Sequence, residues 1–141
     1  MALSNWMKDG IKIGLTGEQR QVVEVEHLID FMGPDVPGVL ATAWLVRFME
    51  HAARNAISPY MEDDEDSVGT EVAIEHTAPT PVGFEVRCRA RVIYVDGRKI
   101  TFEIRADDGV EPVGRATHKR AVVKKSRLAR RIEQKLLESR G

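Results

Sequence analysis

The chain has 141 residues, which is enough for one domain with a hydrophobic core and too short for two. Its 21 lysine and arginine residues nearly balance 22 aspartate and glutamate residues, so no overall charge predicts binding to nucleic acid or to an acidic membrane. The single cysteine, Cys88, excludes an internal disulfide framework. No segment approaches the ~20 apolar residues of a membrane span, so we expect one cytoplasmic domain over residues 1–141.

The N-terminal part of the chain predicts strands. A short apolar start from Leu3 to Met7, followed by Ile11, Ile13 and Leu15 between glycines, indicates a strand that pairs loosely. From Gln21 to Ile29 apolar residues alternate with Glu24 and Glu26, which predicts a half-buried strand. Two prolines and two glycines in residues 31–38 then end the pattern.

Residues Val39 to Ile57 predict one long helix around which the rest of the domain is built. On a helical wheel its apolar residues form a continuous arc of roughly 220°, whereas a helix on one flat layer needs only ~100°. We therefore expect a curved sheet to enclose this helix. Glu50 lies at the edge of the narrow polar face, and Thr42 points from the middle of the apolar face. A helix-capping role is the simpler interpretation of Thr42.

The remainder of the chain predicts an antiparallel sheet and a final helix. Five consecutive acids, Glu62 to Asp66, are most simply a solvated surface loop. Four segments of alternating polarity follow, with turns at Asp96-Gly97 and Asp108-Gly109; these segments are residues 68–76, 84–95, 100–106 and 113–123. Residues 124–141 predict a basic helix with an apolar stripe, for which contact with phosphates is an alternative to a solvated peripheral position.

Three residues in this pattern suggest acyl-transfer chemistry. His76 lies in the core-facing row of its strand, at the strand end and beside a proline-rich turn, although a purely structural histidine fits the same pattern. If His76 meets Thr42 and Glu50, the set offers a hydroxyl, a carboxylate and an imidazole for nucleophilic attack or water activation. Backbone amides near Gly69 or the helix start would then stabilise the oxyanion.

The other histidines give weaker signals. His118 shares a strand face with the small residues Gly114 and Ala116, which leave room for a ligand or a neighbouring chain. No two histidines share a helix face or a close spacing, so we expect no metal site.

The chain resembles the hot-dog-fold acyl-CoA thioesterases, in particular the fluoroacetyl-CoA thioesterase branch. The resemblance covers about residues 21–123 and rests on four segments, VLATAWLVRFMEHAA, SVGTEVAIEHTAPTPVG, VDGRKITFEIRADDG and VGRATHKRAVV. It implies an α+β hot-dog fold, in which an antiparallel sheet of about five to six strands wraps one long central helix. A C-terminal helix follows the resembling core. In that family two subunits join their sheets and coenzyme A thioesters enter at the subunit interface.

The resemblance also implies roles for individual residues. Thr42, Glu50 and His76 match the catalytic residues, Gly69 the backbone beside the thioester carbonyl, and Arg120 a basic residue beside the substrate tunnel. Phe31, Val36 and His118 complete the expected substrate-binding set. Fluoroacetyl-specific enzymes place aromatic residues over the acyl pocket in the loop before the helix. This chain retains Phe31 there but has only Val36 nearer the helix, so selectivity for fluoroacetate does not carry over.

The expected activity is hydrolysis of an acyl-CoA, with CoA as part of the substrate and no further cofactor. Direct water attack and an acyl-enzyme route both remain open, as do a dimer and a tetramer. Two other classes of function fit the sequence: an acyl-CoA or fatty-acyl binding module without activity, and a scaffold whose basic tail binds a partner. We expect no nucleic acid and no membrane among the partners.

Overall fold

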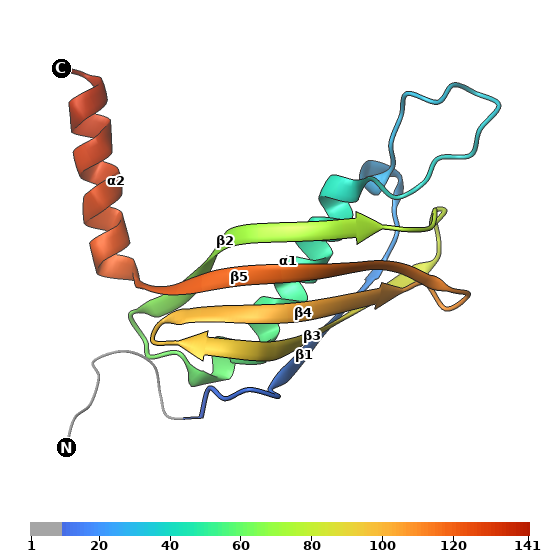
Figure 1. Cartoon of the computed structure of the whole chain (residues 1–141). Coiled ribbons are helices and arrows are strands. Elements are labelled where there is room, and N and C mark those ends of the chain that lie inside the picture. The colour runs from blue at the N-terminus through green and yellow to red at the C-terminus, as the bar shows by residue number, and fades with distance from the viewer. Residues whose placement is uncertain (1–9) are drawn as a thin grey trace.

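A computed structural model describes residues 10–141 and shows one antiparallel sheet with a long helix on one face (Figure 1). The strands are β1 (Thr16–Val22), β2 (Glu65–His76), β3 (Glu85–Asp96), β4 (Lys99–Asp107) and β5 (Pro112–Lys124). Their order across the sheet is β1-β3-β4-β5-β2. The last four strands and the turns at Gly97 and Gly109, both with positive φ, confirm the predicted sheet.

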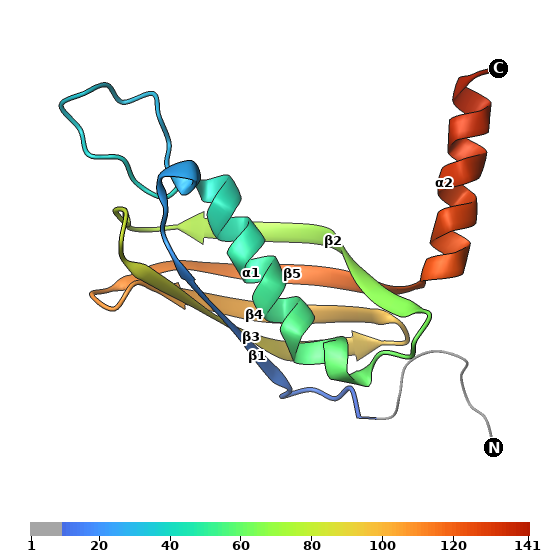
Figure 2. The same ribbon diagram turned by 180° about the vertical axis from the view of Figure 1, so that it is seen from behind.

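Helix α1 (Thr42–Ile57) lies across the inner face of the sheet, as Figure 2 shows. Its buried residues contact inward-facing side chains from the strands, including Phe102 and Ile104, which are fully buried. The close fit depends on Gly17 of β1, because a Cβ there would overlap the helix backbone at Ala52 and Ala56. The broad apolar arc therefore has the enclosure that the sequence predicted.

The helix begins three residues later than predicted, because long-range pairing holds the preceding residues. Val39 forms an isolated β-bridge with Pro81, and Leu40 forms another with Leu28. Ala41 is the N-cap residue and has no side-chain oxygen to satisfy the first turn. The predicted capping role of Thr42 is wrong, since Thr42 is the first helical residue.

The predicted strand over residues 21–29 is also wrong beyond Val22. Residues Val25–His27 form a 3-10 turn, η1, in which the backbone N–H of Glu24 donates to Nδ1 of His27. The His27 ring is buried edge-on against Trp44 and Phe48, while Val25 is exposed. Leu3 to Met7 lies outside the described residues, and β1 starts only after Leu15.

Two β-bulges change which side chains face the helix. In β2 the register shifts between Gly69 and Glu71, so Ser67 and Gly69 lie on the helix side where strict alternation predicted Val68 and Thr70. In β3 a shift between Val92 and Tyr94 leaves Tyr94 exposed, although alternation placed it inward. The bulge in β2 is important because it shapes the candidate site.

The acidic segment Glu62 to Asp66 is only partly the solvated surface that the sequence predicted: Glu62, Asp63 and Asp64 are exposed, but Glu65 is not. Glu65 is buried, accepts the N–H of Glu62 and forms an ion pair with Lys124 at 3.3 Å. Asp64 accepts the N–H and the hydroxyl of Ser126 at the start of the last helix. Asp66 forms two hydrogen bonds with Arg54 of α1. Three of the five acids therefore join β2, α1 and the final helix.

Replacing Glu65 by glutamine should destabilise the protein more than the same change at exposed Glu62. The glutamine keeps an acceptor for the Glu62 N–H but leaves the mostly buried Lys124 ammonium without its carboxylate. Loss of one partner from a buried pair costs about 3 kcal/mol. Urea unfolding of Glu65→Gln and Glu62→Gln measures the difference, and equal midpoints would contradict the structural role of Glu65.

Helix α2 (Lys125–Ser139) confirms the predicted basic C-terminal helix. It projects away from the sheet (Figures 1 and 2), and its stripe of Leu128, Ile132 and Leu136 is exposed. In the part of the chain that the structure describes, no helix is both long and apolar enough to cross a membrane.

Candidate functional site

The first half of the candidate site joins the start of α1 to the end of β2. Thr42 is the first residue of α1 and His76 is the last residue of β2. Thr42 Oγ1 and His76 Nδ1 are 2.8 Å apart, a hydrogen-bonding distance. A hydroxyl bonded to an imidazole is the arrangement in which a weak nucleophile can lose its proton to a base. Thr42 itself is exposed, not buried in the apolar face as the wheel suggested.

The His76 ring is set up to act as a neutral base. Burial lowers its pKa, and the backbone of Ala78 partly opposes that effect. Its other nitrogen, Nε2, is buried and has no hydrogen-bond partner among the described residues. The ring therefore has one nitrogen on Thr42 and one nitrogen available to a further group.

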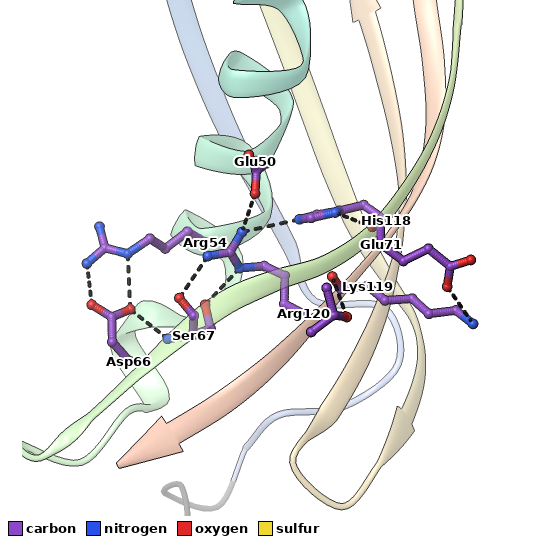
Figure 3. A network of polar contacts seen from close by, with 9 residues as sticks. Glu50, Arg54, Asp66, Ser67, Glu71, His118, Lys119 and Arg120 are labelled. Carbon is purple, nitrogen blue, oxygen red and sulfur yellow. Dashed lines mark hydrogen bonds and ion pairs between the residues drawn. The ribbon is translucent and has the colours of Figure 1, made fainter. Parts of the chain in front are cut away.

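The second half of the candidate site surrounds Glu50, two turns further along α1 (Figure 3). Arg120 Nη1 donates to Glu50 Oε2 at 3.3 Å and approaches His118 Nε2 at 3.2 Å. Ser67 accepts from the same guanidinium twice, through Oγ at 2.8 Å and through its carbonyl at 2.9 Å. Glu50 remains 38 % exposed, so part of its carboxylate is open to a ligand.

Gly69 permits this close arrangement. A Cβ at Gly69 would overlap Glu50 Oε2 and would lie 3.2 Å from His118 Cε1. The strand beside it is fixed to the helix, because Arg54 donates to both oxygens of Asp66 and Asp66 accepts the N–H of Ser67. The bulge, the glycine and the Arg54–Asp66 pair together bring the β2 backbone against Glu50. An isolated glycine inside a strand pattern was the sequence signal for this bulge.

Within the chain the structure does not bring the three predicted catalytic residues together. Thr42 and Glu50 are eight residues apart on α1, which is about 12 Å along the helix axis. Thr42 contacts His76, whereas Glu50 contacts Arg120 and adjoins Gly69. The chain therefore carries two half-sites at different positions along β2. Strand β2 lies at the edge of the sheet, and its side chains Val68 and Val72 are exposed.

The expected substrate-binding residues fall into two groups. His118 and Arg120 are buried, with 1 % and 5 % exposure, behind Glu50. Phe31 and Val36 lie on the loop that leads into α1, and they are 75 % and 49 % exposed. This loop extends beyond the end of the sheet in Figures 1 and 2.

Two other features of the described residues lie away from these half-sites. Glu24, Glu26 and His27 place potential metal ligands within 4.8 Å, but His27 Nδ1 already accepts a backbone N–H. A hollow of about 1090 Å³ extends over all five strands of the sheet, and charged residues such as Arg89 and Arg115 line it. These arginines lie near Glu18 and Glu75, and the hollow includes none of Thr42, Glu50 and His76.

Comparison with known proteins gives a consistent result. Residues 23–126 match the family model FlK, described as fluoroacetyl-CoA-specific thioesterase. The fluoroacetyl-CoA thioesterase of Streptantibioticus cattleyicolor is 35 % identical over 135 residues, which span 92 % of this chain and 97 % of that protein.

Solved structures agree with the sequence matches. A structure of fluoroacetyl-CoA thioesterase FlK has a TM-score of 0.82 and 34 % identity, covering 90 % of this chain and 98 % of that one. A thioesterase superfamily member from Thermus thermophilus has a TM-score of 0.80 and 27 % identity, covering 92 % and 98 %. A hot-dog-like protein from Thermanaerovibrio acidaminovorans, at 22 % identity and a TM-score of 0.79, supports the fold alone; it covers 87 % of this chain and 91 % of that one. The predicted α+β hot-dog fold is confirmed.

Proposed function

The chain belongs to the fluoroacetyl-CoA-specific thioesterase family and is a thioester hydrolase, and from this premise we propose how its own residues hydrolyse an acyl-CoA. The observation that carries the proposal is the 2.8 Å contact between Thr42 Oγ1 and His76 Nδ1. Thr42 Oγ1 bonds to the acyl carbon while its proton passes to His76. The C–S bond then breaks, and the CoA thiolate takes that proton.

The helix start would stabilise the charge that develops on the acyl oxygen. The N–H groups of the first turn of α1 point out of the helix N-terminus. That of Trp44 already donates to the Ala41 carbonyl, but Ala41 supplies no side-chain acceptor for the two N–H groups before it. The oxyanion forms on the acyl group as it bonds to Thr42, and it would accept hydrogen bonds from these donors. Backbone N–H groups stabilise the oxyanion in this way in other acyl-transfer enzymes.

Glu50 would complete the reaction from the other subunit of a homodimer. An antiparallel, two-fold pairing of β2 with the same strand of a partner sets the His76 end of one strand beside the Gly69 end of the other. Such pairing would also cover the exposed edge of the sheet. Glu50 of one chain then activates the water that cleaves the acyl ester on Thr42 of its partner. A tetramer would need a further interface between such dimers.

Gly69, Phe31 and Val36 bind or orient the substrate in this proposal. Gly69 offers its backbone to the thioester, with Arg120 and His118 behind it. Phe31 and Val36 lie on the loop that would cover the acyl group. One related structure contains fluoroacetate and CoA, but within residues 31–38 of this chain the apolar side chain nearest the helix is that of Val36. We therefore propose an acyl-CoA substrate without selectivity for fluoroacetate.

Release of free thiol from a panel of acyl-CoAs tests this function. We expect hydrolysis of at least one short acyl-CoA, and comparable rates for acetyl-CoA and fluoroacetyl-CoA. Binding of acyl-CoA by calorimetry without any thiol release would instead indicate a binding module. Salt-sensitive partner binding that survives loss of His76, with no affinity for CoA esters, would indicate a scaffold.

The pH dependence of turnover should reflect the His76 environment. His76 must be neutral to accept the Thr42 proton, and burial lowers its pKa below the ordinary value of 6.5. Activity should therefore persist below pH 6.5 and fall only as the pH drops through that lowered pKa. Plots of kcat/KM against pH measure this limb, because kcat/KM reports the ionisation of the free enzyme, and an acid limb above 6.5 would contradict a buried neutral base.

A further inference from the structure

A buried row of polar groups lies behind Glu50 and takes no direct part in the reaction above. It runs from the Glu71 carbonyl through His118 and Arg120 to the Glu50 carboxylate (Figure 3). Phe102 of β4 stacks on the His118 ring with centroids 6.1 Å apart. These contacts come from β2, β4, β5 and α1, so four elements of the fold hold the row.

The contacts determine which His118 nitrogen carries the proton. Nδ1 is 2.9 Å from the Glu71 carbonyl, which can only accept, so Nδ1 bears hydrogen. Nε2 faces the Arg120 guanidinium, which can only donate, so Nε2 presents its lone pair. Burial and the positive charge of Arg120 both lower the His118 pKa, with the Glu71 carbonyl opposing them. The ring is therefore neutral and has one tautomer.

This lone pair fixes the direction of the arginine. The guanidinium is planar, and Ser67 occupies its Nε and Nη2 hydrogens on one side. On the other side Nη1 has two hydrogens, of which one meets His118 Nε2 and the other meets Glu50 Oε2. Glu50 is partly exposed, so without this donor its carboxylate would be free to change rotamer.

We propose that His118 is a positioning residue, whose Nε2 lone pair holds Arg120 in the orientation that fixes the Glu50 carboxylate. This inference deepens the proposed function and rests on Glu50 acting in it. It assigns to His118 and Arg120 an indirect part in catalysis in place of direct contact with the acyl-CoA, in agreement with their burial.

The test compares two substitutions that differ in the acceptor. His118→Gln keeps an amide oxygen able to accept from Arg120, whereas His118→Leu fills similar space without any acceptor. We expect His118→Leu to lower kcat by 10- to 100-fold, the order of loss that follows a misplaced catalytic group. Its KM should stay within about twofold of wild type, because the substrate contacts are unchanged. His118→Gln should retain most of the activity.

A matched control separates positioning from general damage. His51→Leu changes an exposed histidine one residue from Glu50 on α1 and should leave kcat unchanged. Equal losses in His118→Leu and His118→Gln, or an unchanged kcat in His118→Leu, would overturn the proposal.

Two measurements do not depend on activity. Nitrogen-15 NMR of the His118 ring should show a protonated Nδ1 and an unprotonated Nε2 at neutral pH. Crystal structures should keep the Arg120–Glu50 contact in His118→Gln and lose it in His118→Leu. The opposite tautomer, or an unchanged contact in His118→Leu, would refute the positioning role even if hydrolysis is confirmed. If the wild-type protein hydrolyses no acyl-CoA, the proposed function is refuted. The two measurements would then still show whether His118 holds the Arg120–Glu50 contact.

Discussion

Replacement of Glu50 by glutamine should lower kcat for acyl-CoA hydrolysis by about 10³-fold, within the range that general base catalysis contributes. The amide keeps the size of the side chain and can still accept from Arg120, but it cannot take a proton from water. Because the proposed acylation uses Thr42 and His76, the variant should accumulate an acyl group on Thr42. To measure this accumulation, the variant is mixed with acetyl-CoA, the reaction is quenched rapidly, and the intact protein is analysed by mass spectrometry.

Glu71→Gln provides the matched control for Glu50→Gln. Glu71 is an exposed glutamate of β2 that pairs with a basic residue, Lys119, as Glu50 pairs with Arg120. We expect wild-type kinetics from this control. If Glu50→Gln kept activity within about threefold of wild type, Glu50 would not be a general base. A large loss without any acylated Thr42 would favour direct attack by water.

Gly69→Ala should have the second largest effect, a loss of about 100-fold in kcat. The added methyl group would overlap Glu50 Oε2 and would lie 3.2 Å from His118 Cε1, which is a tight contact. The Glu50 carboxylate would have to leave its position. Steady-state kinetics with one acyl-CoA measure the loss, and thermal unfolding shows whether the fold is retained.

A double-mutant cycle tells whether the Gly69 effect passes through Glu50. In the Glu50→Gln background the carboxylate has already been removed, so Gly69→Ala should cause little further loss. If the loss of activity in the double variant equals the product of the two single losses, Gly69→Ala acts elsewhere, for example on the fold or on substrate entry.

The sequence predicted the parts of the fold that depend on local pattern. The broad apolar arc of α1 required enclosure, and the alternation in β3, β4 and β5 predicted the antiparallel strands that enclose it. The pairing of Thr42 with His76 was also foreseeable, since one begins a helix and the other ends an inward-facing strand row.

The parts that the sequence did not predict depend on distant contacts. Val39 and Leu40 have helical spacing but pair with Pro81 and Leu28, which delays the start of α1. The bulge after Gly69 reverses the alternation in the first half of β2, so Ser67 replaces Val68 on the helix side. Neither effect is visible in the hydrophobic pattern of one segment.

The acidic segment shows the same limit for charged residues. Glu65 reads as one of five solvated acids, yet Lys124 lies 59 residues away in the chain and 3.3 Å away in the structure. His118 was likewise placed on the correct strand face, but its proton arrangement depends on Glu71 and Arg120 meeting it from both sides. Pairings of this kind are set by the completed sheet.

The central proposal is that each active site combines Thr42 and His76 of one subunit with Glu50 of its partner, and mixed dimers test this most directly. Subunits carrying only Glu50→Gln and subunits carrying only His76→Ala should each be nearly inactive. Random mixing should restore about one quarter of wild-type activity, because half of the dimers are mixed and one of their two sites is intact.

A second mixture provides the control for this measurement. Thr42→Ala and His76→Ala alter the same half-site, which is contributed by one subunit. In a dimer that mixes these two variants, both sites therefore carry one defect, and no activity should return. Recovery of about one quarter from Glu50→Gln with His76→Ala, and none from the control mixture, is the predicted result. No recovery in either mixture, with dimers confirmed to have exchanged subunits, would contradict a shared site.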